Sequence, residues 1–532
     1  MSNALALIPV MLGLASCAPA TDESVDRESG AAPESATHSV ALPARGGTLR
    51  TEYNWIPYVS DPATDGIGTG QVGLSIAESL VWVGEDGVPQ PQLAKSWAVN
   101  DDATVWTLHL QEGVKFNNSK PFGADDVIWN LNHWIDPDTG SPMAARLEFL
   151  SPGGMEKVDD LTVRLHLDRP DVNLLLALYD YPSMIAPEGG WEDFYSGDPA
   201  DAIGTGPFLL ESFVPDERMV LVRNPEYWQM GADGRPLPYL DRVIVTAGWD
   251  DAARLAALVG EEADILTPGE GILSMLRRYS DRIDLQTFVT GFVTPLVMRV
   301  DVPPFDDVRV RSAFKLVQDR ERIRTLVMPL GPVGYDHLVP PSDVAYCAAA
   351  DSGRKHDIER ARSLLAEAGY PDGIDVDLAV PDGDFRVNLA QVYKEMADEA
   401  GIRISINLLP RSAFWDRWME WPFSISGLNG RVPATANMNL TLRCGGEWNE
   451  THYCNPDFDA LLDEADATLD VDRRRGVFCR VQALMQEDSG YLIPFWAATF
   501  GASRSEVYVP RAWSRGGSRW HETWLSNQAE RN

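Results

Sequence analysis

Residues 357–408 repeat one unit, a helix that ends at a glycine and is followed by a strand with alternating side chains. The sequence predicts one helix from about Asp357 to Gly369 and a second from about Phe385 to Gly401. Glycine suits such helix ends because it adopts the left-handed backbone conformation at little cost. The strand residues that are apolar at every second position are Ile374, Val376, Leu378 and Val380, then Ile402, Ile404, Ile406 and Leu408. This pattern predicts layered α/β structure.

The N-terminal half of the chain contains the same two periodicities. Half-buried strands are predicted where Trp106, Leu108 and Leu110, and then Leu161, Val163, Leu165 and Leu167, alternate with polar residues. Between them, apolar residues from Gly123 to Ile135 recur at steps of three and four, which is typical of an amphipathic helix. Ordered structure is expected to begin with a strand entry at residues 46–50. A chain of 532 residues also favours two or three domains over one.

The N-terminus has the pattern of a lipoprotein signal peptide. An apolar run from Ala4 to Ala15 ends in Leu14-Ala15-Ser16-Cys17, and it is shorter than the roughly 18 residues that span a membrane. We expect residues 1–17 to be the signal peptide and the Cys17 thiol to carry the lipid. The absence of Lys and Arg before the run leaves open a short hydrophobic N-terminus with an unrelated cysteine.

Residues 18–45 are rich in Ala, Ser, Glu, Pro and Thr and have little to bury, so they predict a flexible tether. No later segment approaches the length of a membrane span, so the only predicted membrane contact is the lipid. The chain has 79 acidic and 45 basic residues, a formal net charge of −34. This excess of negative charge argues against nucleic acid as a partner.

No catalytic motif is supported by its sequence context. Gly68-Thr69-Gly70-Gln71-Val72-Gly73 resembles a dinucleotide loop, but no strand precedes it, which favours a turn. The chain lacks a phosphate-binding Gly-Lys-Ser/Thr loop and a Gly-x-Ser-x-Gly elbow, and its eight histidines are scattered. Acidic pairs such as Asp125-Asp126 are common in so acidic a chain and are expected on the surface. The sequence therefore predicts no enzyme, no cofactor and no catalytic residue; a surface hydrolase stays a remote alternative.

Four cysteines remain after Cys17. Cys444 and Cys454 bracket a short polar loop and are expected to form a disulfide in an oxidising compartment, worth about 2 to 3 kcal/mol. His452 lies between them, but two thiols and one imidazole do not complete a tetrahedral zinc site, so no metal is predicted. The pairing of Cys347 and Cys479 stays open.

A series of motifs gives the chain a family resemblance. They are Ala77-Glu78-Ser79-Leu80, Leu93-Ala94-Lys95-Ser96-Trp97, residues 106–116, Gly204-Thr205-Gly206-Pro207-Phe208, Arg223-Asn224-Pro225-Glu226-Tyr227-Trp228, residues 304–314, residues 361–369, Asn455-Pro456-Asp457-Phe458-Asp459 and Ile493-Pro494-Phe495. In this order, from Gly46 to the C-terminus, the chain resembles the solute-binding proteins of the oligopeptide, dipeptide and nickel importers, extracellular solute-binding family 5. Their cysteine pair also matches Cys444 and Cys454.

The resemblance implies an α/β, two-lobe periplasmic-binding-protein-like fold of type II, in its large cluster C form, with an extra subdomain in lobe one. By analogy, lobe one holds residues 46–268 and the C-terminal return 495–532, and lobe two holds residues 269–494. It also implies a monomeric substrate-binding lipoprotein of an ABC importer, with permease and ATPase subunits as partners. Such a protein lies in the periplasm or on the outer face of the cell membrane, and its lobes close on ligand by a hinge motion.

Aromatic residues in loops are the first ligand candidates, because rings give large contact area at little entropic cost. Tyr53 and Trp55 follow the first strand, where the family commonly contacts ligand. Phe292 and Trp496 lie near the expected crossings between lobes. Core packing is the alternative for all four.

The segment Gly427-Leu428-Asn429-Gly430-Arg431-Val432-Pro433 aligns with the stretch where peptide-binding relatives place an aspartate for the ligand's amino terminus. Asn429 or Gly430 stands in its place, and Arg431 beside it can pair with a carboxylate or phosphate. Near residues 381–384 the Arg/Tyr pair of dipeptide-binding relatives is also missing. We therefore expect a peptide or a peptide-sized solute, with an oligosaccharide, an opine or another non-peptide ligand as the alternative.

Overall fold

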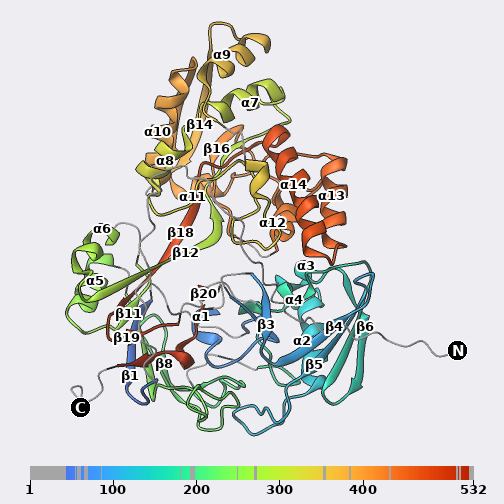
Figure 1. Ribbon diagram of the computed structural model, residues 1–532, viewed down its shortest axis with the longest axis vertical. Helices are drawn as coiled ribbons and strands as arrows, with labels where there is room; N and C mark the ends of the chain where they lie inside the picture. The colour runs from blue at the N-terminus through green and yellow to red at the C-terminus, as the bar shows by residue number, and fades with distance from the viewer. Residues whose placement is uncertain are drawn as a thin grey trace, which may run out of the picture. The chain divides into compact units, whose positions relative to one another are not determined.

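The computed structural model describes the chain from residue 43 onward (Figure 1). The described residues are 43–53, 56, 61–64, 70–84, 87–179, 181–191, 194, 198–248, 250–268, 272–351, 355–382, 385–430, 433–510, 513–514 and 517–526. The signal-peptide and tether predictions at residues 1–42 therefore lie outside the described residues. Residues 43–532 cluster as one unit by their contacts.

A seven-stranded mixed sheet forms the base of lobe one. Its order is β12 (Ile283–Val293), β18 (Trp496–Arg504), β11 (Ile265–Leu266), β1 (Thr48–Tyr53), β10 (Arg242–Ala247), β9 (Arg218–Arg223) and β8 (Phe208–Val214). Strand β1 begins near the predicted entry at residues 46–50 and pairs in parallel with β10 and β11. Leu49, Val243 and Val245 are fully buried from this sheet and pack in one core.

A five-stranded sheet forms lobe two, in the order β15 (Ile402–Leu409), β14 (Ile374–Pro381), β16 (Phe423–Ile425), β13 (Leu296–Met298) and β17 (Tyr491–Leu492). Helices α9 (Ile358–Glu367) and α10 (Phe385–Asp398) precede β14 and β15, as the sequence predicts. The Asp357 carboxylate accepts the Arg360 N–H and caps α9. Gly369 and Gly401 have positive φ values of 97° and 82°, the conformation predicted at both helix ends.

The chain passes between the two sheets twice, through paired strands. Strands β12 and β18 run antiparallel, from Ile283 opposite Arg504 to Val293 opposite Trp496. Strand β13 follows β12 and belongs to the other sheet, and β17 precedes β18 in the same way. The second crossing falls close to the expected boundary at residue 494. The first falls after Val293, later than the expected residue 268, because β12 still pairs with β18 in the sheet of lobe one.

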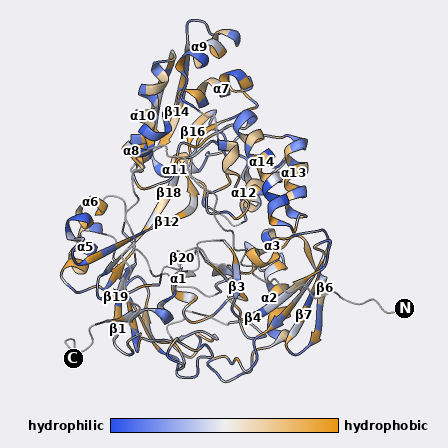
Figure 2. Cartoon of the chain, in the orientation of Figure 1, coloured by the Kyte–Doolittle hydropathy of each residue, from blue (hydrophilic) through white to orange (hydrophobic). Residues whose placement is uncertain are grey.

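A separate four-stranded antiparallel sheet forms the extra subdomain of lobe one. Its order is β4 (Ala94–Val99), β5 (Val105–Leu110), β7 (Thr162–Leu167) and β6 (Leu150–Asp159). The predicted amphipathic helix is α2 (Ala124–Ile135), and it buries Val127, Leu131 and Trp134 against this sheet's core. Helices α3 (Met143–Arg146) and α4 (Leu174–Ala177) complete the subdomain. Figure 2 shows hydrophobic residues along these strands and mixed colours on the helices.

Shorter elements connect these layers. The remaining helices are α1 (Gly70–Gly73), α5 (Asp251–Val259), α6 (Leu273–Leu276), α7 (Val308–Leu316), α8 (Arg320–Val327), α11 (Arg411–Trp415), α12 (Ala434–Thr441), α13 (Pro456–Asp466) and α14 (Val471–Asp488). The remaining strands are β2 (Val81–Val83), β3 (Pro89–Pro91), β19 (Val507–Tyr508), β20 (Trp513–Ser514), β21 (Gly517–Ser518) and β22 (Trp524–Leu525). Helix α1 occupies the end of the Gly68–Gly73 motif, where a plain turn was predicted.

The buried Glu78 carboxylate joins two of the family-like motifs in lobe one, residues 77–80 and residues 223–228. It accepts hydrogen bonds from the Tyr227 hydroxyl at 2.8 Å, the Trp228 indole N–H at 2.9 Å and the Gln92 amide at 3.3 Å. Burial raises the pKa of Glu78, while these donors oppose the shift. Nearby, a Cβ at Gly204 would come within 2.1 Å of the Ile76 carbonyl oxygen, so this position requires glycine. The motifs thus hold the lobe together.

Two disulfides stabilise lobe two. The structure joins Cys444 to Cys454, in agreement with the sequence prediction, with Cα atoms 4.4 Å apart. It also joins Cys347 to Cys479 on α14, a pairing that the sequence left open. The two bridges close loops of very different length, with sequence separations of 10 and 132 residues.

The long-range disulfide is expected to contribute more stability than the short one. Loop-closure entropy predicts a loss of about 5 kcal/mol for the double variant Cys347→Ser/Cys479→Ser and about 3 kcal/mol for Cys444→Ser/Cys454→Ser. Urea unfolding at 25 °C, followed by tryptophan fluorescence, measures both losses. Equal losses, or a larger loss for the short loop, would contradict the prediction.

Candidate functional site

Two of the predicted ligand residues, Phe292 and Asn429, lie close together at the first crossing. Val293 and Leu428 exchange two backbone hydrogen bonds of 3.0 and 2.9 Å, and each of the two candidates adjoins one of these residues. Phe292 is half-buried against the core of lobe two, and the Asn429 side chain is exposed. The Asn429 carbonyl accepts a 3.0 Å hydrogen bond from the Asn437 amide on α12. The residue with the apolar ring and the residue with the polar amide therefore lie on two segments that are paired at the crossing.

Arg386 completes this cluster, and the sequence prediction missed it. It lies in the first turn of α10, and its Nε donates a 3.1 Å hydrogen bond to the Ser426 carbonyl. A Cβ at Gly427 would come within 2.5 Å of its guanidinium and 3.5 Å of the Phe292 ring, so glycine leaves room for both groups. Arg386 comes just after residues 381–384, the segment in which no arginine anchor was found. Arg386 is only 6% exposed, and its bond to the Ser426 carbonyl holds the backbone at the start of the 426–430 loop.

The other predicted ligand residues are placed differently or not described. Tyr53 is half-buried at the end of β1, where its ring meets the buried Trp520 edge to face at 6.1 Å. Burial raises the pKa of its hydroxyl. Trp496 is 1% exposed and packs in the core of lobe two, the alternative that the sequence left open, so its contact with ligand stays a prediction. Trp55 and Arg431 lie outside the described residues.

A cavity of about 500 Å³ lies between the subdomain of lobe one and lobe two. Its walls come from the α3 and α4 regions of the subdomain, from α12 and from the loop closed by Cys444. The charged and aromatic residues that line it are Arg146, Glu148, Phe149, Arg169, Asp171, Tyr179, Arg443, Glu447, Trp448 and Asp466. It therefore offers guanidinium groups, carboxylates and aromatic rings within a volume suited to a small ligand.

Backbone and side-chain bonds cross between the two lobes at this cavity. The Val172 N–H donates to the Asp466 carbonyl at 2.8 Å, and the Asn173 amide donates to the Asp466 carboxylate at 2.7 Å. Burial raises the pKa of both Asp171 and Asp466, and the Asp466 charge raises that of Asp171 further. The sequence contained no local signal for this contact, since its partners are 293 residues apart.

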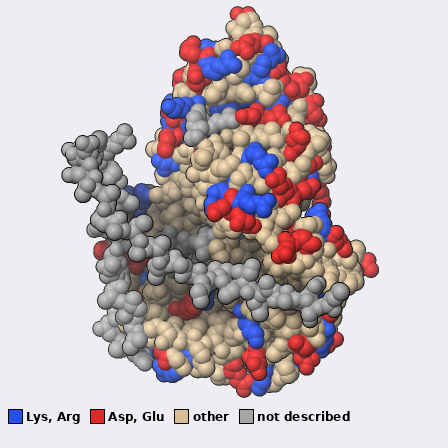
Figure 3. All heavy atoms as spheres, turned by 45° about the vertical axis from the view of Figure 1, so that its right-hand side comes forward, with Lys and Arg blue, Asp and Glu red and all other residues tan. Residues whose placement is uncertain are grey.

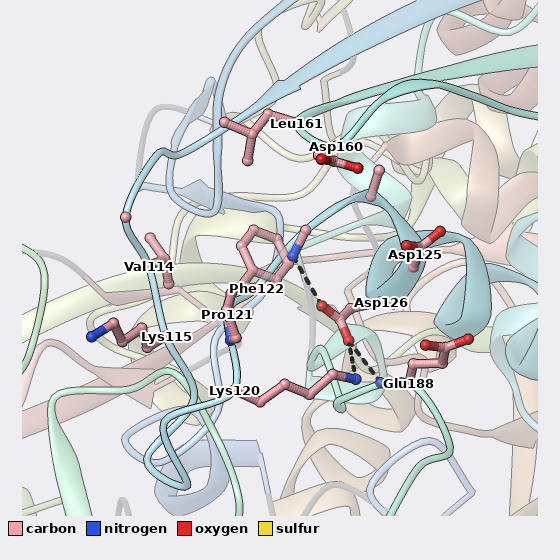
Figure 4. Close-up of a pocket in the computed structure, with 13 residues that line it drawn as sticks. Val114, Lys115, Lys120, Pro121, Phe122, Asp125, Asp126, Asp160, Leu161 and Glu188 are labelled. Carbon is pink, nitrogen blue, oxygen red and sulfur yellow. Dashed lines mark hydrogen bonds and ion pairs between the residues drawn. The ribbon is translucent and has the colours of Figure 1, made fainter.

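Another hollow, of about 380 Å³, lies on the subdomain where α2 begins (Figure 4). Its Asp126 carboxylate accepts from the Lys120 amine at 2.9 Å and from the Gly123 and Glu188 N–H groups at 2.9 and 2.8 Å. These bonds occupy the acid that caps the helix. The sequence predicted that the Asp125-Asp126 pair lies on the solvated surface. Asp126 instead belongs to the local structure, because it is held by these three hydrogen bonds.

Within the residues that the structure describes, no group of three or more His, Cys, Asp or Glu side chains is arranged to hold a metal ion. In the same part of the chain, no helix is both long and apolar enough to cross a membrane. Figure 3 shows acidic and basic side chains interspersed over one face of the molecule. Ion pairs join charged side chains of the described residues, such as Arg403 with Asp375 at 2.7 Å.

Comparison with curated proteins finds relatives over most of the chain. Heme-binding protein A of Haemophilus influenzae is 27% identical over 438 residues, covering 76% of this chain and 78% of that protein. The periplasmic oligopeptide-binding protein OppA of Escherichia coli is 25% identical, covering 81% of this chain and 83% of OppA. The dipeptide-binding protein of Escherichia coli is 26% identical, with coverages of 78% and 82%.

Solved structures share the fold over almost the whole chain. The periplasmic binding protein AgaA of A. tumefaciens R10, solved with agropinic acid, has a TM-score of 0.72 at 24% identity and covers 90% of this chain and 99% of its own. CtaP of Listeria monocytogenes has a TM-score of 0.77 at 21% identity, with coverages of 91% and 100%. DppA of Helicobacter pylori, solved with the peptide STSA, has a TM-score of 0.70 at 21% identity, with coverages of 91% and 99%.

The similarity to solved structures establishes a two-lobe α/β binding-protein fold with an extra subdomain in lobe one. Residues 88–450, more than half of the chain, also match the model of the bacterial extracellular solute-binding proteins, family 5 middle. The chain belongs to this family of solute-binding proteins.

Proposed function

We propose that this protein captures peptides or a peptide-sized solute between its two lobes and delivers the ligand to an ABC importer. The observation that carries the proposal is the cavity of about 500 Å³ between the subdomain and lobe two, in a chain whose two crossings allow a hinge. Closure of the lobes would enclose ligand, and binding energy would select the closed state.

The chemistry of the cavity favours a peptide. Its walls supply guanidinium groups from Arg146, Arg169 and Arg443, carboxylates from Glu148 and Glu447, and the exposed Trp448 ring. A peptide carries charges of both signs at its ends and apolar side chains between them, so it can match each kind of group. The relatives named for oligopeptides and dipeptides support the same class of ligand.

A non-peptide ligand is the second candidate. Asn429 or Gly430 stands where peptide-binding relatives place an aspartate, and Arg431 beside it would favour an anionic group. The fold neighbour AgaA was solved with agropinic acid, an opine. An oligosaccharide could stack on Trp448. A surface hydrolase stays a remote alternative, because neither the sequence motifs nor the described residues of the site single out one group as a general acid and another as a general base.

The proposed partners are the permease and ATPase subunits of the importer, with the receptor acting as a monomer that binds ligand and performs no chemistry itself. The named relatives OppA and the family description support a location outside the cytoplasm. We propose that residues 1–17 direct export, that Cys17 carries the lipid anchor, and that residues 18–45 tether lobe one to it.

A thermal-shift screen tests the ligand class. Peptides of two to nine residues should raise the melting temperature more than opines or oligosaccharides at equal concentration. A ligand at 100 times its dissociation constant adds about 2.7 kcal/mol to the free energy of unfolding. A shift produced only by opines or only by oligosaccharides would replace the peptide proposal, and turnover of any compound would contradict a purely binding role.

Substitutions distinguish ligand residues from core residues. Asn429→Ala and Arg431→Ala should each weaken binding of the best peptide at least tenfold, about 1.4 kcal/mol, while the melting temperature of the free protein hardly changes. Trp496→Ala should instead lower stability by about 3 to 5 kcal/mol, because it empties a buried site. Calorimetric titration and urea unfolding measure these effects, with Asn118→Ala on the subdomain surface as the control. Unchanged affinity in Arg431→Ala would remove Arg431 from the site.

Cys17 can be tested directly as the anchor. Cells that express the full chain and receive labelled palmitate should incorporate label into the wild-type protein, and Cys17→Ser should abolish it. The Cys444→Ser/Cys454→Ser variant serves as a control, because its altered cysteines are not the proposed lipid site. Label that persists in Cys17→Ser would show that the anchor lies elsewhere or that residues 1–17 are no lipoprotein signal.

A further inference from the structure

We propose that Asp171 and Asp466 form a proton-dependent latch that holds the subdomain of lobe one against lobe two. The inference rests on the proposed function only in that closing the latch would help to enclose a ligand. The hydrogen bonds that form it join described residues of the subdomain and of lobe two. Its position is the cavity between the lobes, where the α4 region of the subdomain meets the end of α13.

The subdomain side of the latch is a rigid turn. The Asp171 carboxylate accepts the Asn173 N–H at 2.6 Å, which fixes the turn whose residues Val172 and Asn173 bond to lobe two. The turn is anchored behind, because the Asp171 N–H donates to the Ala103 carbonyl at 3.1 Å and the Trp106 indole donates to the Asp171 carbonyl at 3.1 Å. Any movement of this turn therefore carries the subdomain sheet with it.

The lobe-two side is Asp466, the last residue of α13. Its backbone carbonyl accepts the Val172 N–H, and its carboxylate accepts the Asn173 amide. Asp171 and Asp466 are 5% and 8% exposed, and Asn173 bonds to both, through its backbone N–H to the Asp171 carboxylate and through its amide to the Asp466 carboxylate. Two buried carboxylates held on either side of one residue resist being ionised together, so a proton on one of them stabilises the contact between the lobes.

The surrounding charges do not remove this repulsion. Arg169 lies near both acids but forms an ion pair with Glu148, and Glu148 itself raises the pKa of Asp171. Arg443 lies near Asp466 and pairs with Asp463 at 2.7 Å.

Two further basic groups and two further acids complete the surroundings. Arg474 approaches from α14, and its own pKa is lowered by burial, against the pull of Asp343, Asp466 and Asp171. Arg146 and Glu447 line the same cavity with opposite charges. The two carboxyl groups therefore keep raised pKa values despite their basic neighbours.

The direction of the pH effect follows from these shifts. Opening the latch returns the acids toward solvent and toward the ordinary aspartate pKa of 3.8, so the closed state binds more protons than the open state. Closure is consequently favoured at low pH and weakens as the pH rises above about 4. For one shared proton, the ratio of closed to open protein falls at most about tenfold for each pH unit.

The test measures closure without ligand. Spin labels are attached to cysteines at Glu112 of the subdomain and Lys394 of lobe two, both exposed, in a Cys17→Ser background so that only the new thiols react. Pulsed electron resonance then gives the distance distribution between the labels from pH 5 to pH 8. The wild-type protein should shift toward the longer distance as pH rises, whereas Asp171→Asn, which keeps an oxygen acceptor for the Asn173 N–H, should stay closed.

Asp168→Asn is the matched control, because it removes an exposed carboxylate three residues earlier and should behave as wild type. Asp466→Asn provides a second test if Asp171→Asn fails to fold, and it too should abolish the pH-dependent shift. A wild-type distribution that does not change with pH, or a variant that keeps the full shift, overturns the latch. Because no ligand is used, a failed peptide screen leaves this result unaffected.

Discussion

The pairing of β12 with β18 is the constraint on which the two-lobe structure depends. These strands carry the chain between the sheets in opposite directions, so any movement of one lobe relative to the other must bend both crossings together. The register of the pair shifts between Val289 and Val293, and Gly291 within this irregularity has a φ of 72°. A bulge with a left-handed glycine redirects the strand. The strand then passes close to Gly430, since a Cβ placed at Gly291 would lie 3.3 Å from the Gly430 Cα atom. The irregularity lies just before Phe292, and the pairing with β18 resumes at Val293, the last residue of β12.

The sequence predicted local structure well because local structure depends on nearby residues. The α9–β14–α10–β15 series followed from helix caps, glycine ends and strand alternation, each readable within a few residues. The first crossing was placed too early because the pairing of β12 with β18 joins residues about two hundred positions apart and leaves no periodic signal. The Cys347–Cys479 bridge was undetermined for the same reason, with 132 residues between its partners.

The candidate site was predicted less completely than the fold. The family resemblance directed attention to Phe292 and Asn429, and the structure brings their segments together. Trp496 shows the limit of that approach: proximity to a crossing does not distinguish a ring in a cleft from a ring in the core, and the structure places it in the core. Arg386 and the Asp171–Asp466 contact were missed because one arginine or aspartate carries no local mark of burial. In a chain with 79 acidic residues, the few that are buried cannot be distinguished by sequence.

The two ends of the interface between the lobes differ in how they can move. At the crossings, the two strands β12 and β18 lead from one sheet to the other within the described residues, and a glycine bulge lies in β12. At the cavity, lobe two presents a loop closed by the Cys444–Cys454 disulfide, beside Arg443, which pairs with Asp463 on α13. The subdomain presents a turn fixed by the bonds of Asp171. Both surfaces at the cavity are rigid, so a hinge motion that separates the lobes has to change the backbone at the crossings. The bonds from Val172 and Asn173 to Asp466 then form or break together. Under the proposed function, closure makes these contacts together, and the importer recognises the state in which they are formed.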